Sequence, residues 1–420
     1  MQVFKFGGAS VNSVERIQNV GNIMKHWGNE KVVIIVSAMG KTTNALEKVV
    51  DAFFAGKKEE ALQLFEQVKQ RHLTTAKYLL VTNYNACENQ LKDFITEIEW
   101  LLHDKPVRDY YYYYDQIVCV GELFSTAVVS AYLNEAGINN KWLDVRDVIR
   151  TDDDFGDATI DWKFTSSKVK DSVLPLFNNT NIILTQGFIG ATDENESTTL
   201  GREGSDYTAA IFANMLDAEN LTIWKDVEAV MNADPKQFPA VESIAELNYN
   251  EVIEMAYYGA QVIHPKTIKP LQNKGIPLYV KCFLDPTLPG TIIHNKPVHN
   301  LPPIIVLKEN QVMLEMSSRD FSFVGEHHVG HLYNLLEKLN IKPTLTQNGA
   351  ISFVCVLDDR TEKIEKLALE ASAFLDVQVV KGLSLLTVRH YSKEIFEKLT
   401  EGKTILLRQQ TPETIQLLLQ

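Results

Sequence analysis

Near the N-terminus, one lysine and two glycines form a pattern that can bind phosphate. Lys5 lies in the apolar run Val3–Phe6, Gly7 and Gly8 follow it, and the next segment has apolar residues at helical spacing. Free N–H groups at the start of a helix, together with a nearby ammonium, favour an anionic ligand. A plain strand-to-helix turn has the same composition, so the pattern needs support from elsewhere in the chain.

A second polar segment, 201–208, precedes apolar residues that predict a helix over 209–216. In this segment Arg202 can hold a carboxylate through two parallel hydrogen bonds, and Asp206 can hold an ammonium group. The two residues together suit a zwitterionic ligand. The alternative is that Ser205 or Asp206 only caps the helix.

Three other fragments resemble functional motifs but lack their partners. Residues 40–42 end like a phosphate-binding P-loop, but Ile35 stands where that motif needs its first glycine. Residues 154–156 read Asp-Phe-Gly without the other protein-kinase motifs, and we interpret them as a loop. His327 and His331 share a helix face, but no carboxylate accompanies them, so we predict no metal site built from protein side chains.

The elements that must position these residues alternate between strand and helix. Short apolar runs are followed by a polar loop and then a helical pattern at 3–6, 32–36, 182–184 and 221–224. This alternation is typical of βαβ units around a mostly parallel sheet. We therefore predict an α/β fold whose loops can bind phosphate at the starts of its helices.

After residue 294 the pattern changes. The segment 295–303 is polar and contains three prolines, which predicts a linker between a domain at 1–298 and a region at 304–420. Over about 308–381 the expected order is βαββαβ, a ferredoxin-like arrangement. A shortened second module is predicted for about 382–420, and its last element, 413–419, is predicted to be a helix.

Length and charge limit the classes of function. The 420 residues predict two or three domains. The chain has 41 Lys and Arg against 54 Asp and Glu, a net charge of −13, which argues against nucleic acid as a partner. The four cysteines lie far apart, no leader is predicted, and no apolar run approaches the ~18 residues that span a membrane. We expect a cytoplasmic protein without membrane partners.

Seven short motifs, taken in order, resemble the aspartokinase family. They are KFGGAS at 5–10, VGELFS at 120–125, RTDDDFG at 150–156, TQGFIG at 185–190, LGREGSDYTAA at 200–210, WKDVEAVMNADP at 224–235 and GAQVIHP at 259–265. The segment beyond them is similar to the paired ACT modules of aspartokinases, which bind end-product amino acids. The resemblance implies an amino-acid kinase fold followed by α+β ferredoxin-like ACT modules.

The same resemblance implies a reaction, in which the γ-phosphoryl group of ATP moves to the β-carboxylate of L-aspartate and Mg²⁺ is held largely by the nucleotide. Lys5 and Asp206 then take the catalytic positions, and the N–H groups of Gly7 and Gly8 assist at the phosphates. Asp226 matches an acidic residue near the nucleotide. No general base is needed, because the attacking carboxylate is already ionised.

The resemblance also assigns the residues that bind the aspartate substrate. Arg202 matches the residue that binds its α-carboxylate, and Glu122 the residue that receives its α-ammonium group. The remaining positions, which shape the substrate pocket, are Thr43, Phe188 and Ser205. Without the resemblance, Glu122 would be interpreted as a surface carboxylate and Thr43 as a helix cap.

The chain departs from the family pattern at four positions matched to the nucleotide site. Lys225 stands where Thr is common, Met231 where Tyr is common, and Lys236 where Arg is common. Gln261 replaces a lysine, and the added cation at Lys225 can compensate for that loss. Glu203 replaces a glycine in the substrate loop, which restricts the backbone there.

The regulatory region departs further from its relatives. Thr344 and Gly349 stand where lysine-sensitive relatives have an Asp and a Ser, so lysine inhibition is not expected. Ser317, Ser318 and Asp320 are candidates for binding the charged ends of an end-product amino acid, but a simple turn explains these residues equally well. ACT modules commonly pair edge to edge, which implies a homodimer through this region.

Two alternatives to an aspartate kinase stay open. One is a kinase for another amino acid such as glutamate, which the Arg202 to Asp206 loop and the tandem ACT tail argue against. The other is a non-catalytic amino-acid sensor that keeps the fold, suggested by the substitutions at Lys225, Met231 and Gln261. The retention of Lys5 argues against the sensor.

Overall fold

A computed structural model describes residues 1–260 and 262–420 of the chain, and these residues form two compact units. The first consists of Met1–Val230, Ser243–Ile253 and Val262–Val298. The second consists of Met231–Glu242, a short stretch that begins at Glu254, and His299–Gln420. The chain passes from the first unit to the second for the last time between Val298 and His299, within the polar segment 295–303. That residues 1–298 form a catalytic domain and residues 304–420 a regulatory region stays a prediction.

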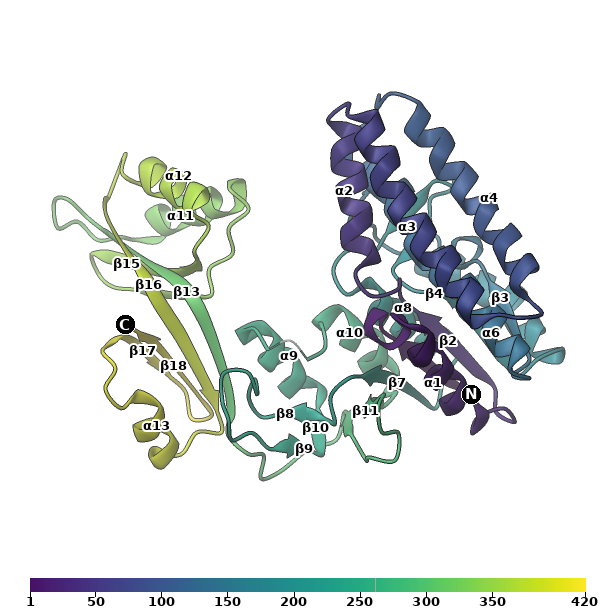
Figure 1. Cartoon of the computed structure of the whole chain (residues 1–420). Helices are drawn as coiled ribbons and strands as arrows, with labels where there is room; N and C mark the ends of the chain where they lie inside the picture. Colours follow the sequence, from purple (N-terminus) through teal and green to yellow (C-terminus); the bar gives the residue numbers. More distant parts are fainter. Residues whose placement is uncertain (261) are drawn as a thin grey trace. The chain divides into compact units, whose positions relative to one another are not determined.

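The first unit is built on an eight-stranded sheet with the order β10-β12-β11-β7-β1-β2-β4-β3 (Figure 1). All its neighbouring strands are parallel except β11 and β12, so the predicted mostly parallel sheet is confirmed. Its strands are β1 (Gln2–Phe6), β2 (Val32–Val36), β3 (Asn140–Leu143), β4 (Ile182–Gln186), β7 (Asn220–Lys225), β10 (Glu246–Asn248), β11 (Leu278–Cys282) and β12 (Thr291–His294). The central strand β2 is buried along its whole length, as expected of a strand covered on both faces.

Helices follow the strands, and some pack directly on the sheet while others pack on neighbouring helices. They are α1 (Val14–Lys25), α2 (Thr42–Phe54), α3 (Lys58–Leu79), α4 (Tyr84–His103), α5 (Tyr110–Val118), α6 (Val120–Glu135), α7 (Trp162–Lys168), α8 (Gly204–Met215), α9 (Tyr249–Tyr258) and α10 (Pro265–Lys274). The long helices α2, α3 and α4 lie side by side (Figure 1). Short elements complete the unit: β5 (Ile189–Ala191), β6 (Ser197–Thr199), β8 (Val230–Met231), β9 (Ser243–Ile244) and the 3₁₀ turn η1 (Gly8–Val11).

One helical stretch, Tyr110–Glu135, is long and apolar enough to cross a membrane by length and composition. The prediction that no segment approaches this length was therefore wrong. However, 83% of its most apolar window is buried inside the protein. Its apolar side chains pack in the core, as in α6, where 12 of the 16 residues are buried.

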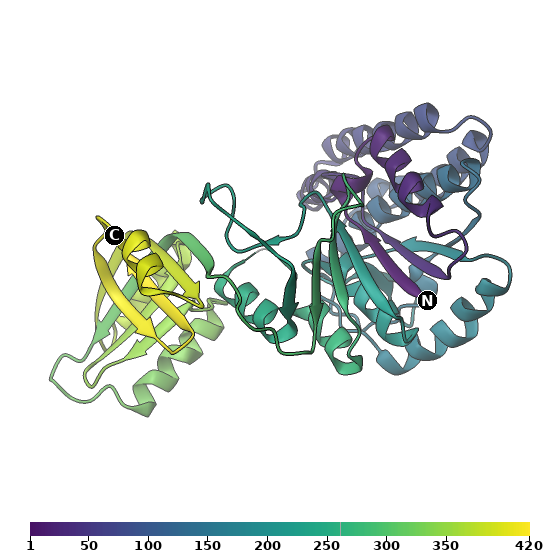
Figure 2. The same ribbon diagram turned by 90° about the horizontal axis from the view of Figure 1, so that it is seen from below.

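The second unit contains a six-stranded antiparallel sheet with the order β14-β15-β13-β16-β18-β17, drawn in green and yellow in Figures 1 and 2. Its strands are β13 (Ile304–Ser317), β14 (Leu345–Asn348), β15 (Ser352–Asp358), β16 (Asp376–Arg389), β17 (Ile405–Gln410) and β18 (Thr414–Leu419). Three helices accompany them: α11 (Glu326–Lys338), α12 (Thr361–Ala371) and α13 (Lys393–Thr400). The βαββαβ order predicted for the first module is the one observed.

The two ferredoxin-like modules share the long strands β13 and β16. Met313–Ser317 of β13 pairs with Asp376–Val380 in the first module, whereas Ile304–Lys308 pairs with Leu385–Arg389 in the second. The second module therefore uses chain from both sides of the first. Two consecutive modules were predicted from the sequence instead. Local patterns do not show which distant strands will pair.

The predicted helix over 413–419 was wrong, because this segment forms strand β18. It lies between β16 and β17 and pairs with both. Ile415, Leu417 and Leu418 are almost fully buried. A short, continuous apolar run fits a buried helix and a central strand equally well, and only the neighbouring strands decide between them.

Candidate functional site

A cavity of about 350 Å³ lies where the loops after β1, β2, β4 and β7 meet. These loops follow the carboxyl ends of neighbouring parallel strands, the usual place for a ligand in an open α/β sheet. The lining residues are Lys5, Gly8, Ser37, Ala38, Gly40, Thr43, Glu122, Phe188, Glu203, Gly204, Ser205, Asp206 and Lys225. The structure thus brings together Lys5, Gly8, Thr43, Glu122, Phe188, Ser205, Asp206 and Lys225 from the sequence-predicted set.

Lys5 and Asp206 form a buried ion pair in this cavity. The distance from Lys5 Nζ to Asp206 Oδ1 is 2.6 Å, and the two side chains are only 12% and 6% exposed. Burial alone would raise the pKa of Asp206, but the charges of Lys5 and then Lys225 hold it below its ordinary value. Asp206 therefore stays ionised and fixes the Lys5 ammonium in place.

Glu122 is the second buried carboxyl group of the cavity, in the first turn of α6. Its Oε1 accepts a hydrogen bond from Ala38 N at 3.3 Å, whereas its Oε2 is buried without a hydrogen-bond partner. Burial raises the pKa of Glu122 to about 8, although the Ala38 N–H group and Lys5 act in the opposite direction. A cation that enters the cavity would meet this unpaired oxygen and favour its ionised form.

Close backbone packing explains why Gly8 lines the cavity. A Cβ atom at Gly8 would lie 2.5 Å from the carbonyl oxygen of Ala38. Gly40 N also donates a hydrogen bond to Gly8 O at 2.8 Å. The loops after β1 and β2 therefore interlock through their backbones. Gly7, the preceding residue, lies beside the Lys5 ammonium group, since a Cβ atom on it would be 3.4 Å from Lys5 Nζ.

Two residues hold left-handed backbone conformations at the other wall of the cavity. Phe188 has a φ of 72° and Glu203 a φ of 56°, values that favour glycine. Phe188 N donates to Thr208 Oγ1 at 3.0 Å, which holds the turn in place. Glu203 occupies the position before α8 and its side chain makes no cap. Ser205 and Asp206 follow inside the helix, so neither is the helix cap that remained as the alternative.

Comparison with known proteins identifies the family. The amino acid kinase family matches residues 1–282. The chain belongs to this family. The lysine-sensitive aspartokinase 3 of Escherichia coli is 30% identical over 396 residues, which cover 92% of the chain and 86% of that relative. The chloroplastic aspartokinase 2 of Arabidopsis thaliana is 31% identical over 408 residues, which cover 92% and 73%.

Solved structures agree with this membership of the amino acid kinase family. Aspartokinase III of E. coli in complex with lysine and aspartate has a TM-score of 0.83 and 28% identity, covering all of the chain and 95% of that structure. The same enzyme in complex with aspartate and ADP has a TM-score of 0.80 at 28% identity. Within the family the chain belongs with the aspartokinases, and the predicted amino-acid kinase fold followed by ACT modules is confirmed.

Other predicted site residues of this amino acid kinase lie outside the cavity lining. Arg202 is exposed in the loop before α8 and does not line the cavity. Met231 and Lys236 belong to the second unit, and Lys236 is exposed. Gln261 lies outside the described residues. The roles of these four residues stay predictions.

Lys225 and Asp226, adjacent at the end of β7, have different surroundings. The Lys225 side chain lines the cavity, and its Nζ donates a hydrogen bond to Val262 O. Asp226 is instead paired with Arg16, whose Nη1 lies 2.8 and 2.9 Å from its two carboxylate oxygens. Sequence reasoning missed Arg16, because its partner is 210 positions away and no local pattern links the two.

A further residue that the sequence did not single out is Asp115. Its carboxylate is fully buried and accepts hydrogen bonds from Gly156 N at 3.0 Å, Thr199 N at 2.9 Å and Thr199 Oγ1 at 2.6 Å. Burial raises the pKa of Asp115 to about 6, although these hydrogen bonds act to lower it. Asp115 thereby joins the loop at 154–156 to β6, which leads into the loop of Arg202. The prediction that 154–156 is a loop is confirmed.

The candidate effector residues lie at the end of β13, in the second unit. Asp320 Oδ1 accepts hydrogen bonds from Ser318 Oγ at 2.8 Å and from Ser322 N at 3.0 Å. The bonds from Ser322 and then Ser318 lower the pKa of Asp320 to about 2. Ser317 is the last residue of the strand. Ser318 and Asp320 therefore take part in hydrogen bonds within the loop that follows β13, and the role of the three candidates in binding an effector stays a prediction.

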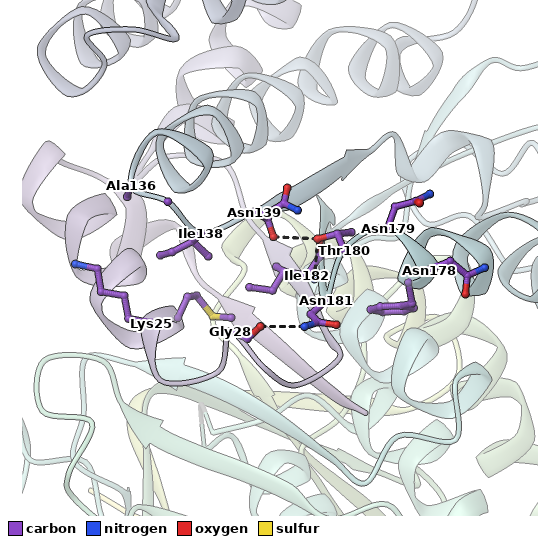
Figure 3. A pocket seen from close by; sticks show the side chains of 13 residues that line it. Lys25, Gly28, Ala136, Ile138, Asn139, Asn178, Asn179, Thr180, Asn181 and Ile182 are labelled. Carbon is purple, nitrogen blue, oxygen red and sulfur yellow. Dashed lines mark hydrogen bonds between the residues drawn. The ribbon is translucent and has the colours of Figure 1, made fainter.

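A larger hollow of about 490 Å³ lies at the amino ends of β3 and β4, and Figure 3 shows its lining. Two of its hydrogen bonds are marked there: Thr180 Oγ1 donates to Asn139 O at 2.9 Å, and Asn181 Nδ2 donates to Gly28 O at 3.1 Å (Figure 3). Lys25 is its one lysine. The hollow contains none of the predicted site residues and lies at the opposite ends of the strands from the cavity.

Within residues 1–260 and 262–420, no group of three or more His, Cys, Asp or Glu side chains is arranged to hold a metal ion. The carboxylate nearest to Lys5, Asp206, is already paired with it. A magnesium ion in this site would therefore depend on phosphate oxygens and water for most of its ligands.

Proposed function

We propose that the protein is an aspartate kinase, which transfers the γ-phosphoryl group of ATP to the β-carboxylate of L-aspartate. One observation carries this proposal: a single cavity contains a fixed lysine ammonium, Lys5, and an unpaired buried carboxyl oxygen of Glu122. The first suits phosphate and the second suits the ammonium group of an amino acid. The solved aspartokinase III complex with aspartate and ADP supports the same pair of ligands.

In this proposal the aspartate substrate lies between Glu122 and the start of α8. Its α-ammonium group binds Glu122 Oε2, and Arg202 closes over its α-carboxylate. Thr43, Phe188 and Ser205 shape the space around its side chain. Arg202 is exposed, so it must turn inward when the substrate binds. A change of side-chain rotamer on binding is common at interfaces.

The nucleotide phosphates lie at Lys5, with the backbone of Gly7 and Gly8 beneath them and Lys225 at their side. We further infer that Asp226, Met231, Lys236 and Gln261 contribute to the nucleotide site. Magnesium bound with the nucleotide neutralises charge on its phosphate oxygens. The donor set fits this arrangement, because the cavity offers two cations and no cluster of metal ligands within the described residues.

Catalysis then depends on position and charge. The attacking β-carboxylate is ionised at neutral pH, so no side chain must remove a proton. Lys5 stabilises the negative charge that spreads over the oxygens of the transferred phosphoryl group. Asp206 does not react, but its ion pair prevents Lys5 from turning away. Closure of the loop that carries Arg202 would exclude water from the phosphoryl group.

We also infer the setting of this activity. The product, 4-phospho-L-aspartate, begins the synthesis of lysine, threonine and methionine, and the tail is a regulatory region at 304–420 with ACT modules at about 308–381 and 382–420. Ser317, Ser318 and Asp320 are the candidates for contact with an end-product amino acid. A cytoplasmic homodimer formed through the ACT region is the expected assembly.

The test is ADP release from Mg-ATP, measured with L-aspartate, with L-glutamate and with neither. We expect release that requires aspartate. Release with glutamate instead would favour the other amino-acid kinase. No release, together with calorimetric binding of aspartate, would favour the non-catalytic sensor. Lysine and threonine, added singly, then test whether the tail responds to an end product.

A further inference from the structure

Arg16 contacts the loop after β1 and the loop after β7 at the same time. It lies in the first turn of α1, where Ser13 caps the helix by accepting a hydrogen bond from Arg16 N. Its Nη1 donates to both carboxylate oxygens of Asp226, at 2.8 and 2.9 Å, and to Ala9 O at 3.0 Å. The side chains of Arg16 and Asp226 are 26% and 35% exposed, so solvent weakens the pair only in part.

The loop after β11 completes the contact. The guanidinium carbon of Arg16 lies 5.7 Å from the ring centre of Phe283, within the range of a cation–π interaction. From the same helix, Asn19 Nδ2 donates to Phe283 O at 2.8 Å. Phe283 N in turn donates to Lys225 O at 2.7 Å. Since β11, β7 and β1 are neighbours in the sheet, helix α1 fixes the carboxyl ends of three adjacent strands.

These strand ends carry the cations of the cavity. Lys5 lies on β1, four residues before Ala9, and Lys225 directly precedes Asp226 on β7. A movement of either loop changes the spacing between the two ammonium groups and the direction of the Gly8 backbone.

We propose that Arg16 is a positioning residue for the nucleotide phosphates, and that Asp226 acts by holding Arg16 rather than by contacting the nucleotide. This inference rests on the proposed function, because it assumes that the cavity binds ATP. It differs from the role that the family resemblance gives Asp226. The two roles predict different results when Arg16 and Asp226 are changed together.

The experiment is a double-mutant cycle with R16M, D226A and the double variant in the full chain. The readouts are the affinity for ADP by calorimetry, and the KM values for ATP and aspartate with kcat. Loss of a partly exposed charged hydrogen bond predicts about a ten-fold weaker ADP affinity and a ten-fold higher KM for ATP in R16M. The KM for aspartate should stay unchanged, whereas general damage to the fold would alter every constant.

The cycle decides between the two roles of Asp226. If Asp226 acts through Arg16, D226A lowers the ADP affinity as much as R16M does, and the double variant binds ADP no more weakly than either single variant. If it contacts the nucleotide independently, the two losses multiply to about a hundred-fold and the proposal is wrong. Unchanged ADP affinity in R16M would also contradict it. Should R16M fail to fold, R16K replaces it in the cycle with D226A. The lysine ammonium keeps the charge but lacks the planar guanidinium group that packs on Phe283, so R16K should also weaken ADP affinity.

Lys25 provides the matched control, since it lies in the same helix but at the hollow drawn in Figure 3, away from the cavity. K25M removes the same charge and should leave ADP affinity unchanged. An equal loss in K25M would mean that net charge, rather than the contact, causes the effect, and would overturn the proposal. If the wild-type chain binds ADP but does not phosphorylate aspartate, the proposed function fails while the ADP cycle still tests Arg16.

Discussion

Replacement of Glu122 by glutamine should stabilise the free protein at high pH and abolish aspartate binding. The pKa of this carboxyl group is raised from 4.5 to about 8 in the fold. Between these two values the unfolded chain releases the proton while the folded chain keeps it, so stability falls as pH rises. At about 1.4 kcal/mol for each pH unit, the loss reaches about 5 kcal/mol above pH 8.

The assay is urea unfolding of the wild type and E122Q at pH 5 and pH 9. At pH 5 the wild-type carboxyl group is protonated and resembles the amide, so the two free energies of unfolding should be similar. At pH 9 the variant should be more stable by several kcal/mol, because it buries no charge. Saturating aspartate should stabilise only the wild type, since its ammonium group pairs with the ionised Glu122.

Glu194, an exposed glutamate in the loop between β5 and β6, gives the control E194Q. This change should leave the difference between pH 5 and pH 9 unaltered. If E122Q is no more stable than the wild type at pH 9, Glu122 does not bury an unpaired carboxyl oxygen. If E122Q still binds aspartate as well as the wild type does, Glu122 is not the ammonium site.

K5M should lower kcat about a thousand-fold while aspartate affinity is kept, because Lys5 acts on the developing phosphoryl charge; a kcat equal to that of the wild type would remove Lys5 from the mechanism. G8A should destabilise the fold by about 1 to 3 kcal/mol in thermal unfolding, because its Cβ atom would lie 2.5 Å from Ala38 O, and a fully stable G8A would show that the two loops can separate. L418A should cost about 2 to 5 kcal/mol in urea unfolding, because Leu418 is fully buried in β18, which pairs with strands on both sides; an unchanged free energy of unfolding would contradict this packing.

Sequence patterns predicted those parts of the site that depend on neighbouring residues. Lys5, Gly8 and Asp206 each lie at a junction of strand, loop and helix, and such junctions have local signatures. Their meeting in one cavity follows from parallel strands, which end at the same edge of a sheet. Thr43, Glu122, Phe188 and Lys225 line the same cavity, but these four residues were predicted only through the family resemblance.

The features that the sequence could not predict depend on distant partners. Arg16 meets Asp226, and Asp115 meets Thr199, across 210 and 84 positions respectively. The strand β18 and the shared strands of the two ACT modules depend likewise on pairing between remote segments. The strand and helix periodicities, of two and 3.6 residues, predict local secondary structure and carry no information about such contacts. The exposure of Arg202 could not be predicted for a different reason. The residue type does not show whether its loop is open or closed.

The most direct test of the central claim is to trap the product of the reaction. An acyl phosphate reacts with hydroxylamine, so incubation with Mg-ATP, L-aspartate and hydroxylamine should yield a hydroxamate whose fragmentation places it on the β-carboxyl group. We predict that the wild type forms this β-hydroxamate and that K5M forms almost none. A hydroxamate that forms only when L-glutamate replaces L-aspartate, or ADP release without any hydroxamate, would contradict the assignment of Lys5, Glu122 and Asp206 to an aspartate kinase site.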